Sequence, residues 1–238
     1  MRKMKTIVWI IVLCLVASTG FAACAEGEKM DTERFKAMIR DRVLSILYAW
    51  PADDQYAIMF FIYPNESYEY RGYSNIPEFQ MNYRCESDLL ENNNPFFDPV
   101  DEDENRWNPA FWDDDTLASV IGFDEPNAMA DALIDWYETI GVENIGLEAE
   151  DTVYDENSVY IGKGPNGFPE LLQIISEVAA ELQNDGTIEN RFGRKIPVIL
   201  ADFEFTWYMI RATQNANPNG EAEGYIDSCI RQGYIREQ

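Results

Sequence analysis

Tyr56-Ala57-Ile58-Met59-Phe60-Phe61-Ile62-Tyr63 is a run of eight apolar and aromatic residues without a charged side chain. The run is continuous, whereas a strand with one face in water alternates apolar and polar residues. Its β-branched, aromatic and long apolar side chains favour a strand over a helix. We therefore predict a strand that is buried on both faces.

The residues that follow this run predict a β-hairpin. Pro64-Asn65-Glu66-Ser67 is typical of a turn. Three tyrosines between Tyr68 and Tyr73 then partly alternate with charged residues, as expected for a second strand.

Apolar periodicity predicts helices on both sides of the hairpin. From Asp31 to Trp50 the apolar residues fall on one stripe, and Asp31 or Thr32 can cap the start of that helix. Residues 168–183 have the clearest helical period. Further helices are predicted over about 75–90, 124–140, 203–216 and 221–234. A loop is predicted over 92–105. Short strands are predicted over 145–147 and 159–161, and 196–201 is either a strand or the start of a buried helix. The fold class is α/β (α+β): a single domain with a mainly antiparallel sheet, in which the hairpin packs against several helices.

The N-terminal residues predict a secretion signal over 1–23. Three basic residues precede the apolar run 7–16, which is too short to span a bilayer comfortably. Small residues follow and end at Cys24, which predicts a bacterial lipoprotein signal with Cys24 as the lipid-modified first residue. The alternative is ordinary cleavage near Ala23-Cys24-Ala25. Residues 24–31 are predicted to form a short tether, and residues 32–238 are predicted to form the globular domain.

These predictions place the protein outside the cytoplasm. It would be either anchored to the cell envelope through a lipid on Cys24, its only contact with a membrane, or soluble after secretion into the periplasm or medium.

The charge of the chain restricts its partners. The sequence has 18 Lys and Arg against 43 Asp and Glu, a formal net charge of −25, which becomes −28 without the first 23 residues. Such a chain repels nucleic acid and anionic membranes, so the partners predicted by charge are cationic: a basic protein, a polyamine or a metal ion. The chain has no histidine, which excludes Ser-His-Asp and Cys-His catalysis and the commonest zinc ligand.

The stretch Asn105-Arg106-Trp107-Asn108-Pro109-Ala110-Phe111-Trp112 is the candidate binding motif. Arg106 is the one basic residue among 22 acidic residues between Glu86 and Glu156. A guanidinium in these surroundings pairs with carboxylates, and the large aromatic rings beside it favour a core. Arg106, Trp107 and Trp112 are therefore candidate binding residues, although the motif favours a structural role for them.

No metal or cofactor site is predicted. Asp101, Asp103 and Asn105 have the spacing of the first ligands of a calcium loop, but Arg106 stands where that loop needs glycine. Gly162-Lys163-Gly164-Pro165 resembles a phosphate-binding loop in composition only, without its spacing.

Cys85 and Cys229 remain once the signal and a lipidated Cys24 are set aside. In an oxidising compartment they are candidates for a disulfide bond, and the alternative is two separate buried thiols.

The helix-then-hairpin opening, the Arg106–Trp112 pattern and the late helix followed by 196–218 together resemble a bacterial family of uncharacterised proteins, domain of unknown function 4303. The resemblance covers most of 32–234. It implies a single α/β domain and supplies no catalytic residues. It also implies a place in toxin-neutralising, contact-competition systems, although export departs from the usual cytosolic members.

Two functions follow from these observations. The first is an exported acidic binding protein that neutralises a basic toxin or another basic partner. The second is a secreted, carboxylate-based hydrolase of the glycosidase kind. The acidic run Asp113-Asp114-Asp115 is a poor predictor of a paired catalytic site, because adjacent side chains diverge, so we assign no catalytic residue.

Overall fold

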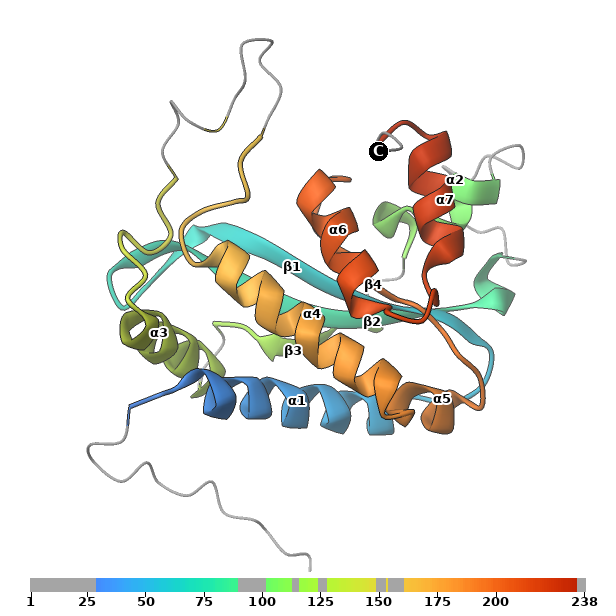
Figure 1. Ribbon diagram of the computed structural model, residues 1–238, viewed down its shortest axis with the longest axis horizontal. Coiled ribbons are helices and arrows are strands. Elements are labelled where there is room, and N and C mark those ends of the chain that lie inside the picture. The colour runs from blue at the N-terminus through green and yellow to red at the C-terminus, as the bar shows by residue number, and fades with distance from the viewer. Residues whose placement is uncertain are drawn as a thin grey trace, which may run out of the picture.

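The computed structural model describes residues 29–89, 102–112, 116–123, 128–148, 153 and 161–234. Their architecture is α+β, with helices packed on one mixed sheet of strand order β3-β2-β1-β4 (Figure 1). The described elements are α1 Thr32–Ala49, β1 Gln55–Tyr70, β2 Tyr73–Cys85, η1 Glu86–Leu89, α2 Glu102–Trp107, η2 Pro109–Phe111, β3 Ala118–Ile121, α3 Ala128–Ile140, α4 Phe168–Asn184, α5 Thr187–Phe192, β4 Val198–Ala201, α6 Trp207–Ala216 and α7 Glu223–Arg231.

The sheet is built on the hairpin of β1 and β2. These two strands pair antiparallel, β2 pairs antiparallel with β3, and β1 pairs parallel with β4. Two of the three pairings are antiparallel, which confirms the predicted fold class.

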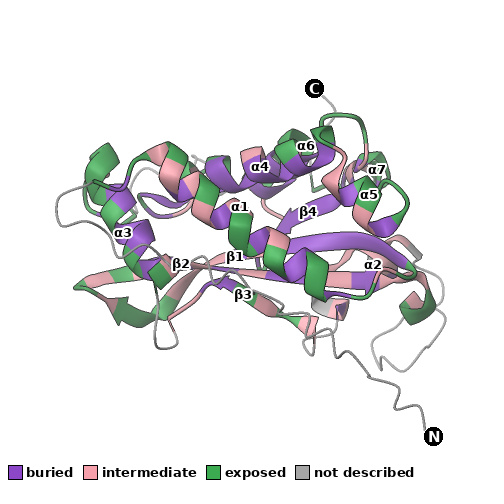
Figure 2. Ribbon diagram, turned by 90° about the horizontal axis from the view of Figure 1, so that it is seen from below, coloured by how far each residue is buried: buried purple, intermediate pink, exposed green. Residues whose placement is uncertain are grey.

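The first half of β1, which contains most of the apolar run 56–63, is buried on both faces, as its sequence predicts. Ile58, Phe60 and Ile62 enter a large core that contains the apolar faces of α1, α3 and α4. The intervening Met59 enters a second core, on the other face of the sheet, that contains Tyr225 of α7. Figure 2 shows β4 and the first part of β1 in purple, the colour of buried residues. The continuous apolar run is therefore explained by two cores that share one sheet.

The position of the hairpin turn was predicted wrongly. The chain turns at Arg71-Gly72 rather than at 64–67, and both turn residues have positive φ (53° and 85°). A two-residue hairpin turn with positive φ at both positions matches the twist of the flanking strands. Within β1, the Asn65 side chain accepts a hydrogen bond of 2.9 Å from the Ser67 backbone, and the pairing register shifts just after Asn65. The turn-like residues thus form an irregularity inside a long strand.

The helix predicted over 75–90 is also wrong. Residues Tyr73–Cys85 form β2, and Glu86–Leu89 form the short 3-10 helix η1. Phe79 and Met81 alternate into the large core beside β1. Pro77 lies opposite Pro64, and both lack a backbone donor. Pairing with β1 therefore overrides the helix-start signal of this proline.

The other expectations have mixed outcomes. The helix α1 is confirmed, with the Asp31 side chain accepting a hydrogen bond of 2.8 Å from the Arg34 backbone. The helix α4 is confirmed, and 196–201 contains the strand β4 rather than a helix start. The loop predicted over 92–105 ends in the helix α2, and 145–147 form a turn rather than a strand.

The backbone groups at the outer edge of β4 form hydrogen bonds with side chains of α6 and of the residue just after it. Asn217, just after α6, accepts a hydrogen bond from the Val198 backbone N–H (2.9 Å) and donates one to its carbonyl (2.7 Å). Thr213 does the same for Leu200, at 2.9 and 3.2 Å. The otherwise open edge of the sheet is therefore closed against pairing with another chain.

Within the described residues, none of the helices combines the length and the apolar character that crossing a membrane would require.

Candidate functional site

The Arg106 side chain contacts the Glu86 carboxylate and lies over the Tyr56 and Trp107 rings. Its Nη1 and Nη2 donate to Oε1 and Oε2 of Glu86 at 3.1 and 2.8 Å, which is the bidentate pairing that a guanidinium favours. The guanidinium also lies 4.6 Å from the centre of the Tyr56 ring. Tyr56 in turn donates a hydrogen bond of 2.6 Å to the Arg106 carbonyl. These contacts fix the motif to the first residues of β1.

The two tryptophans of the motif pack into the second core. Trp107 makes edge-on contacts with Tyr56 and Tyr225, at 5.8 and 5.9 Å between ring centres. Trp112 is 6% exposed, and its buried indole N–H has no hydrogen-bond partner among the residues that the structure describes. A buried donor without an acceptor is costly, so Trp112 marks a place where a bound acceptor would stabilise the protein.

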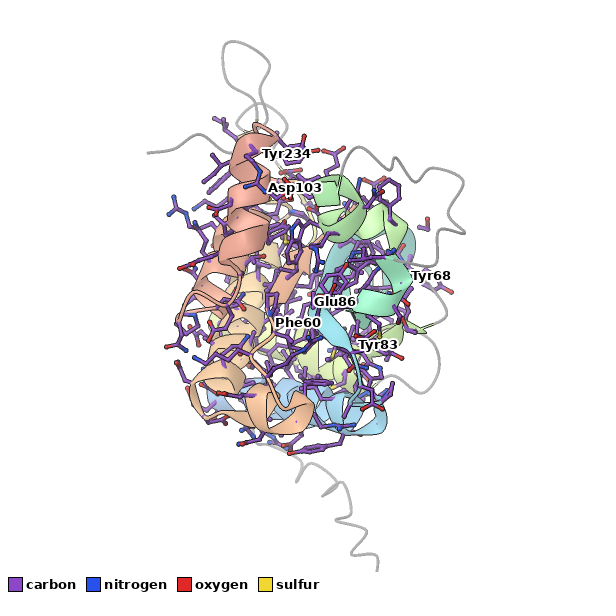
Figure 3. All side chains as sticks on the ribbon, turned by 90° about the vertical axis from the view of Figure 1, so that its right-hand side faces the viewer. Phe60, Tyr68, Tyr83, Glu86, Asp103 and Tyr234 are labelled. Atoms are coloured by element: carbon purple, nitrogen blue, oxygen red, sulfur yellow. The ribbon has the colours of Figure 1, made fainter. Side chains whose placement is uncertain are left out.

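The helix α7 supports the motif from outside. Arg231 Nε donates to Asp103 of α2 at 2.8 Å, and Figure 3 shows Asp103 close to Tyr234. The Tyr234 ring stacks on Phe205, with centres 4.3 Å apart and planes at 3°. This stacking also ties the segment after β4 to the C-terminal residues.

A cavity of about 280 Å³, hereafter the acidic pocket, lies where the motif meets the middle of β1 and the end of β4. Phe61 of β1 pairs with Ala201, the last residue of β4, so the residues after Ala201 lie beside the middle of β1. The lining residues come from β1, the motif and the segment after β4: Met59, Phe61, Asn108, Pro109, Trp112, Leu117, Asp202, Phe203, Glu204 and Phe205. The pocket thus combines two carboxylates with aromatic rings, and none of these residues is Lys or Arg.

Asp202 is the buried carboxylate of this pocket. Its Oδ1 accepts from the Glu204 backbone at 2.9 Å, and its Oδ2 accepts from the hydroxyls of Thr206 and Tyr208 at 3.3 and 3.1 Å. Burial raises the pKa of Asp202 above its ordinary value of 3.8, because the charged form loses hydration. A cation in the pocket would stabilise that charged form.

An exposed aromatic surface borders the acidic pocket. Phe203 is 76% exposed, although its ring contacts Phe61 and Tyr63 at 5.1 and 4.9 Å between centres. The Tyr63 hydroxyl donates a hydrogen bond of 2.8 Å to Glu78. Carboxylates and ring faces therefore occur together beside the middle of β1.

The structure separates the predicted site residues into two groups. Trp112 lines the acidic pocket, whereas Arg106 and Trp107 hold the motif in place. The acids of the pocket, Asp202 and Glu204, were not predicted. The signal that could have found them is Asp202-Phe203-Glu204-Phe205, which alternates acids and rings directly after a buried strand.

Cys85 and Cys229 are free thiols in the structure, so the candidate disulfide is not formed there. Cys85 ends β2, with its sulfur 4.0 Å from the Asp53 carbonyl oxygen, and Cys229 is buried in the second core. Burial raises the pKa of each thiol to about 11. Cys24 and the run Asp113–Asp115 lie outside the described residues, and among the described residues there is no cluster of three or more metal-ligating side chains.

Comparisons of the chain with protein-family models, with curated proteins and with solved structures gave no match. The family resemblance and the function inferred from the sequence therefore stay predictions.

Proposed function

We propose that this chain is an exported, strongly acidic binding protein whose acidic pocket holds a cationic side chain of a basic partner. The observation that carries the proposal is the lining of the pocket, where Asp202 and Glu204 lie among aromatic rings and none of the described lining residues is cationic. Carboxylates and ring faces are the two groups that attract a lysine or arginine side chain.

The burial of Asp202 supports a cationic ligand. Its carboxylate already accepts three hydrogen bonds, so its position is fixed before a partner arrives. A cation would offset the lost hydration of the ionised form. Binding of a cation should therefore become tighter as the pH rises through the raised pKa of Asp202.

The charge of the whole chain supports the same class of partner. A formal net charge of −25 accelerates the approach of a basic protein, and the pocket would then select one protruding side chain. Export, with or without a lipid on Cys24, would place the protein where it can meet secreted partners. A toxin is a partner of this kind, in line with the resemblance to domain of unknown function 4303.

Binding of short peptides tests the proposal. Pentalysine and pentaarginine should bind at fixed ionic strength, whereas pentaglutamate should not. The double variant Asp202→Asn/Glu204→Gln should lower the affinity for the basic peptides about tenfold or more, because it removes both pocket charges. Phe203→Ala should lower it about threefold by removing one ring.

The matched control is Asp41→Asn/Glu69→Gln, which removes the same two charges from exposed sites on α1 and β1. It should change the affinity less than about threefold, since distant exposed charges are screened by salt. Equal losses in the two double variants would mean that the net charge alone attracts the peptides, and the pocket would then have no specific role.

A carboxylate-based hydrolase is the second candidate, favoured by the raised pKa of Asp202, which is what a general acid needs. It is less well supported, because Asp202 and Glu204 are two residues apart on one segment, whereas glycosidases place two carboxylates on opposite sides of the scissile bond. Release of a chromophore from aryl glycosides, abolished by Asp202→Asn, would favour this function over binding.

A further inference from the structure

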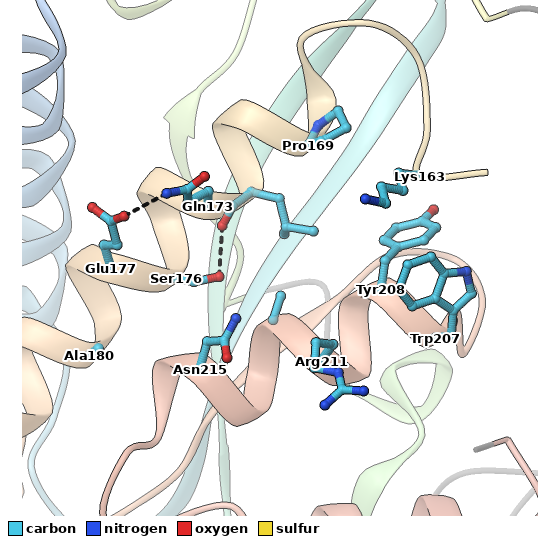
Figure 4. A pocket seen from close by; sticks show the side chains of 12 residues that line it. Lys163, Pro169, Gln173, Ser176, Glu177, Ala180, Trp207, Tyr208, Arg211 and Asn215 are labelled. Carbon is cyan, nitrogen blue, oxygen red and sulfur yellow. Dashed lines mark hydrogen bonds between the residues drawn. The ribbon is translucent and has the colours of Figure 1, made fainter. Parts of the chain in front are cut away.

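A second cavity, hereafter the α4–α6 cavity, has the opposite chemistry to the acidic pocket. Its volume is about 510 Å³, and it lies between the faces of α4 and α6. Lys163, just before α4, and Arg211 of α6 both line it, together with Trp207 and Tyr208. In the view of Figure 4 the two rings lie between the two cationic side chains.

Lys163 and Arg211 are uncommitted cations. Within the described part of the chain, neither makes a hydrogen bond or an ion pair, whereas Lys36, Arg40, Arg71, Arg106 and Arg231 are all paired with carboxylates. A protein with 43 acidic residues has many possible partners for a cation. Two cations without a partner among the described residues, on the wall of one cavity, give that cavity a positive lining that suits an anionic ligand.

Among the described residues of the cavity wall, the carboxylate is that of Glu177, and it is paired with Lys36, which also pairs with Glu181 at 2.7 Å. Glu177 accepts a hydrogen bond of 2.9 Å from Lys36, which reaches it from α1, and another of 3.0 Å from Gln173. The hydrogen bond from Lys36 is the main reason that the pKa of Glu177 lies below its ordinary value. Glu177 therefore opposes an anion less than an unpaired carboxylate would.

The rings add a second requirement for the ligand. Trp207 is 39% exposed, and Tyr208 lines the cavity beside it at 5.9 Å between ring centres. A flat ligand can stack on an exposed indole, so the ligand of this cavity should contain a planar ring.

We propose that the α4–α6 cavity binds a small organic anion in which a carboxylate or phosphate group is joined to a planar ring. The oxyanion lies between Lys163 and Arg211, and the ring lies on Trp207. This site is separate from the acidic pocket, and its ligand has the opposite charge, so each proposal can fail without the other.

Calorimetric titration of the intact protein tests this site. The probes are phenyl phosphate and phenylacetate, compared with neutral benzyl alcohol and with inorganic phosphate. At least one of the two ring anions should bind, and the tighter one identifies the oxyanion. Benzyl alcohol and inorganic phosphate should bind at least about tenfold more weakly, because each lacks one of the two groups.

The variants Lys163→Gln and Arg211→Gln should each lower the affinity for the ring anion about tenfold. Lys195→Gln is the matched control, because Lys195 is exposed, is likewise unpaired among the described residues, and does not line the cavity. The variants remove exposed side chains, so thermal melting should show that all three fold. The proposal is overturned if neither ring anion binds, if benzyl alcohol binds equally well, or if the three variants lose affinity equally.

Discussion

The hydroxyl group of Tyr208 donates a hydrogen bond of 3.1 Å to Oδ2 of Asp202. Asp202 lines the acidic pocket, whereas Tyr208 lines the α4–α6 cavity. A single hydrogen bond therefore joins the walls of two cavities whose lining charges are opposite. Protonation of Asp202 removes a charge from the acidic pocket and changes the acceptor of the Tyr208 hydroxyl, which belongs to the wall of the α4–α6 cavity.

The first prediction concerns the pH dependence of stability. Burial raises the pKa of Asp202 in the folded protein, so the folded protein binds this proton more tightly than the unfolded chain. The stability that the bound proton contributes is fully present below the ordinary pKa and is lost as the pH rises through the raised value. The wild type should therefore lose stability relative to Asp202→Asn as the pH rises from 4 to 7. The difference in the free energy of unfolding between the two proteins should shift in favour of the variant over this range.

Urea denaturation at several pH values measures this gain. Asp41→Asn, at an exposed site on α1, is the control. The chain has no histidine, so no histidine titration obscures this range. A difference between Asp202→Asn and wild type that stays constant with pH would contradict the prediction.

Local signals in the sequence predicted the elements whose burial is decided locally. The apolar run of β1 needs no knowledge of its neighbours, because burial on both faces is visible in the residues themselves. The helices α1 and α4 carry their period and their ends in the same way. In β2, by contrast, Pro77 gives a helix-start signal, and only pairing with β1 makes Phe79 and Met81 part of a strand.

The acidic pocket could not be predicted for a related reason. Trp112 and Asp202 are far apart in the sequence. They meet because Trp112 packs on Tyr56 of β1 and because β4, which ends just before Asp202, pairs with β1. The sequence of the four residues of β4 does not indicate which strand β4 pairs with. The motif at Arg106 was found because its composition is unusual, and composition is a local property.

The second prediction concerns the edge of the sheet. Asn217 is buried and bonds both backbone groups of Val198, so Asn217→Ala would leave a buried donor and a buried acceptor unpaired. We expect a loss of about 2–4 kcal/mol in the free energy of unfolding. Asn219→Ala, two residues on and exposed, should cost less than about 0.5 kcal/mol. Chemical denaturation of both variants tests this, and equal stabilities would show that the edge needs no such closure.

The third prediction concerns export. The order of basic, apolar and small residues up to Cys24 predicts processing at this position. The intact mass of the protein from its native host should correspond to a chain that begins at Cys24 with an attached lipid, or that is cleaved just after it. Recovery of the full-length, unmodified chain would contradict both forms of the prediction.

The fourth prediction concerns the thiols. Burial raises the pKa of Cys85 and Cys229 to about 11, so the reactive thiolate is scarce at neutral pH in both. A chain that begins at Ala25 should show two free thiols after denaturation without a reducing agent. In the folded protein the same thiols should react slowly with iodoacetamide, and Cys229 should be the slower because it is buried. Fewer than two thiols in the denatured sample would show that the disulfide forms.

The last prediction concerns Arg106. Its bidentate pair with Glu86 is partly exposed, with side-chain exposures of 24% and 40%, so its loss should cost less than the loss of a fully buried pair. We expect Arg106→Ala to lower the free energy of unfolding by about 1–2 kcal/mol, because the ring contact with Tyr56 is lost as well. Arg106→Lys should recover only part of this, because lysine lacks the planar fork.

The control is Arg231→Ala, whose pair with Asp103 is more exposed and should contribute at most about 1 kcal/mol. If chemical denaturation finds Arg106→Ala as stable as wild type, the motif is not held by its guanidinium, and Arg106 becomes a candidate ligand-binding residue.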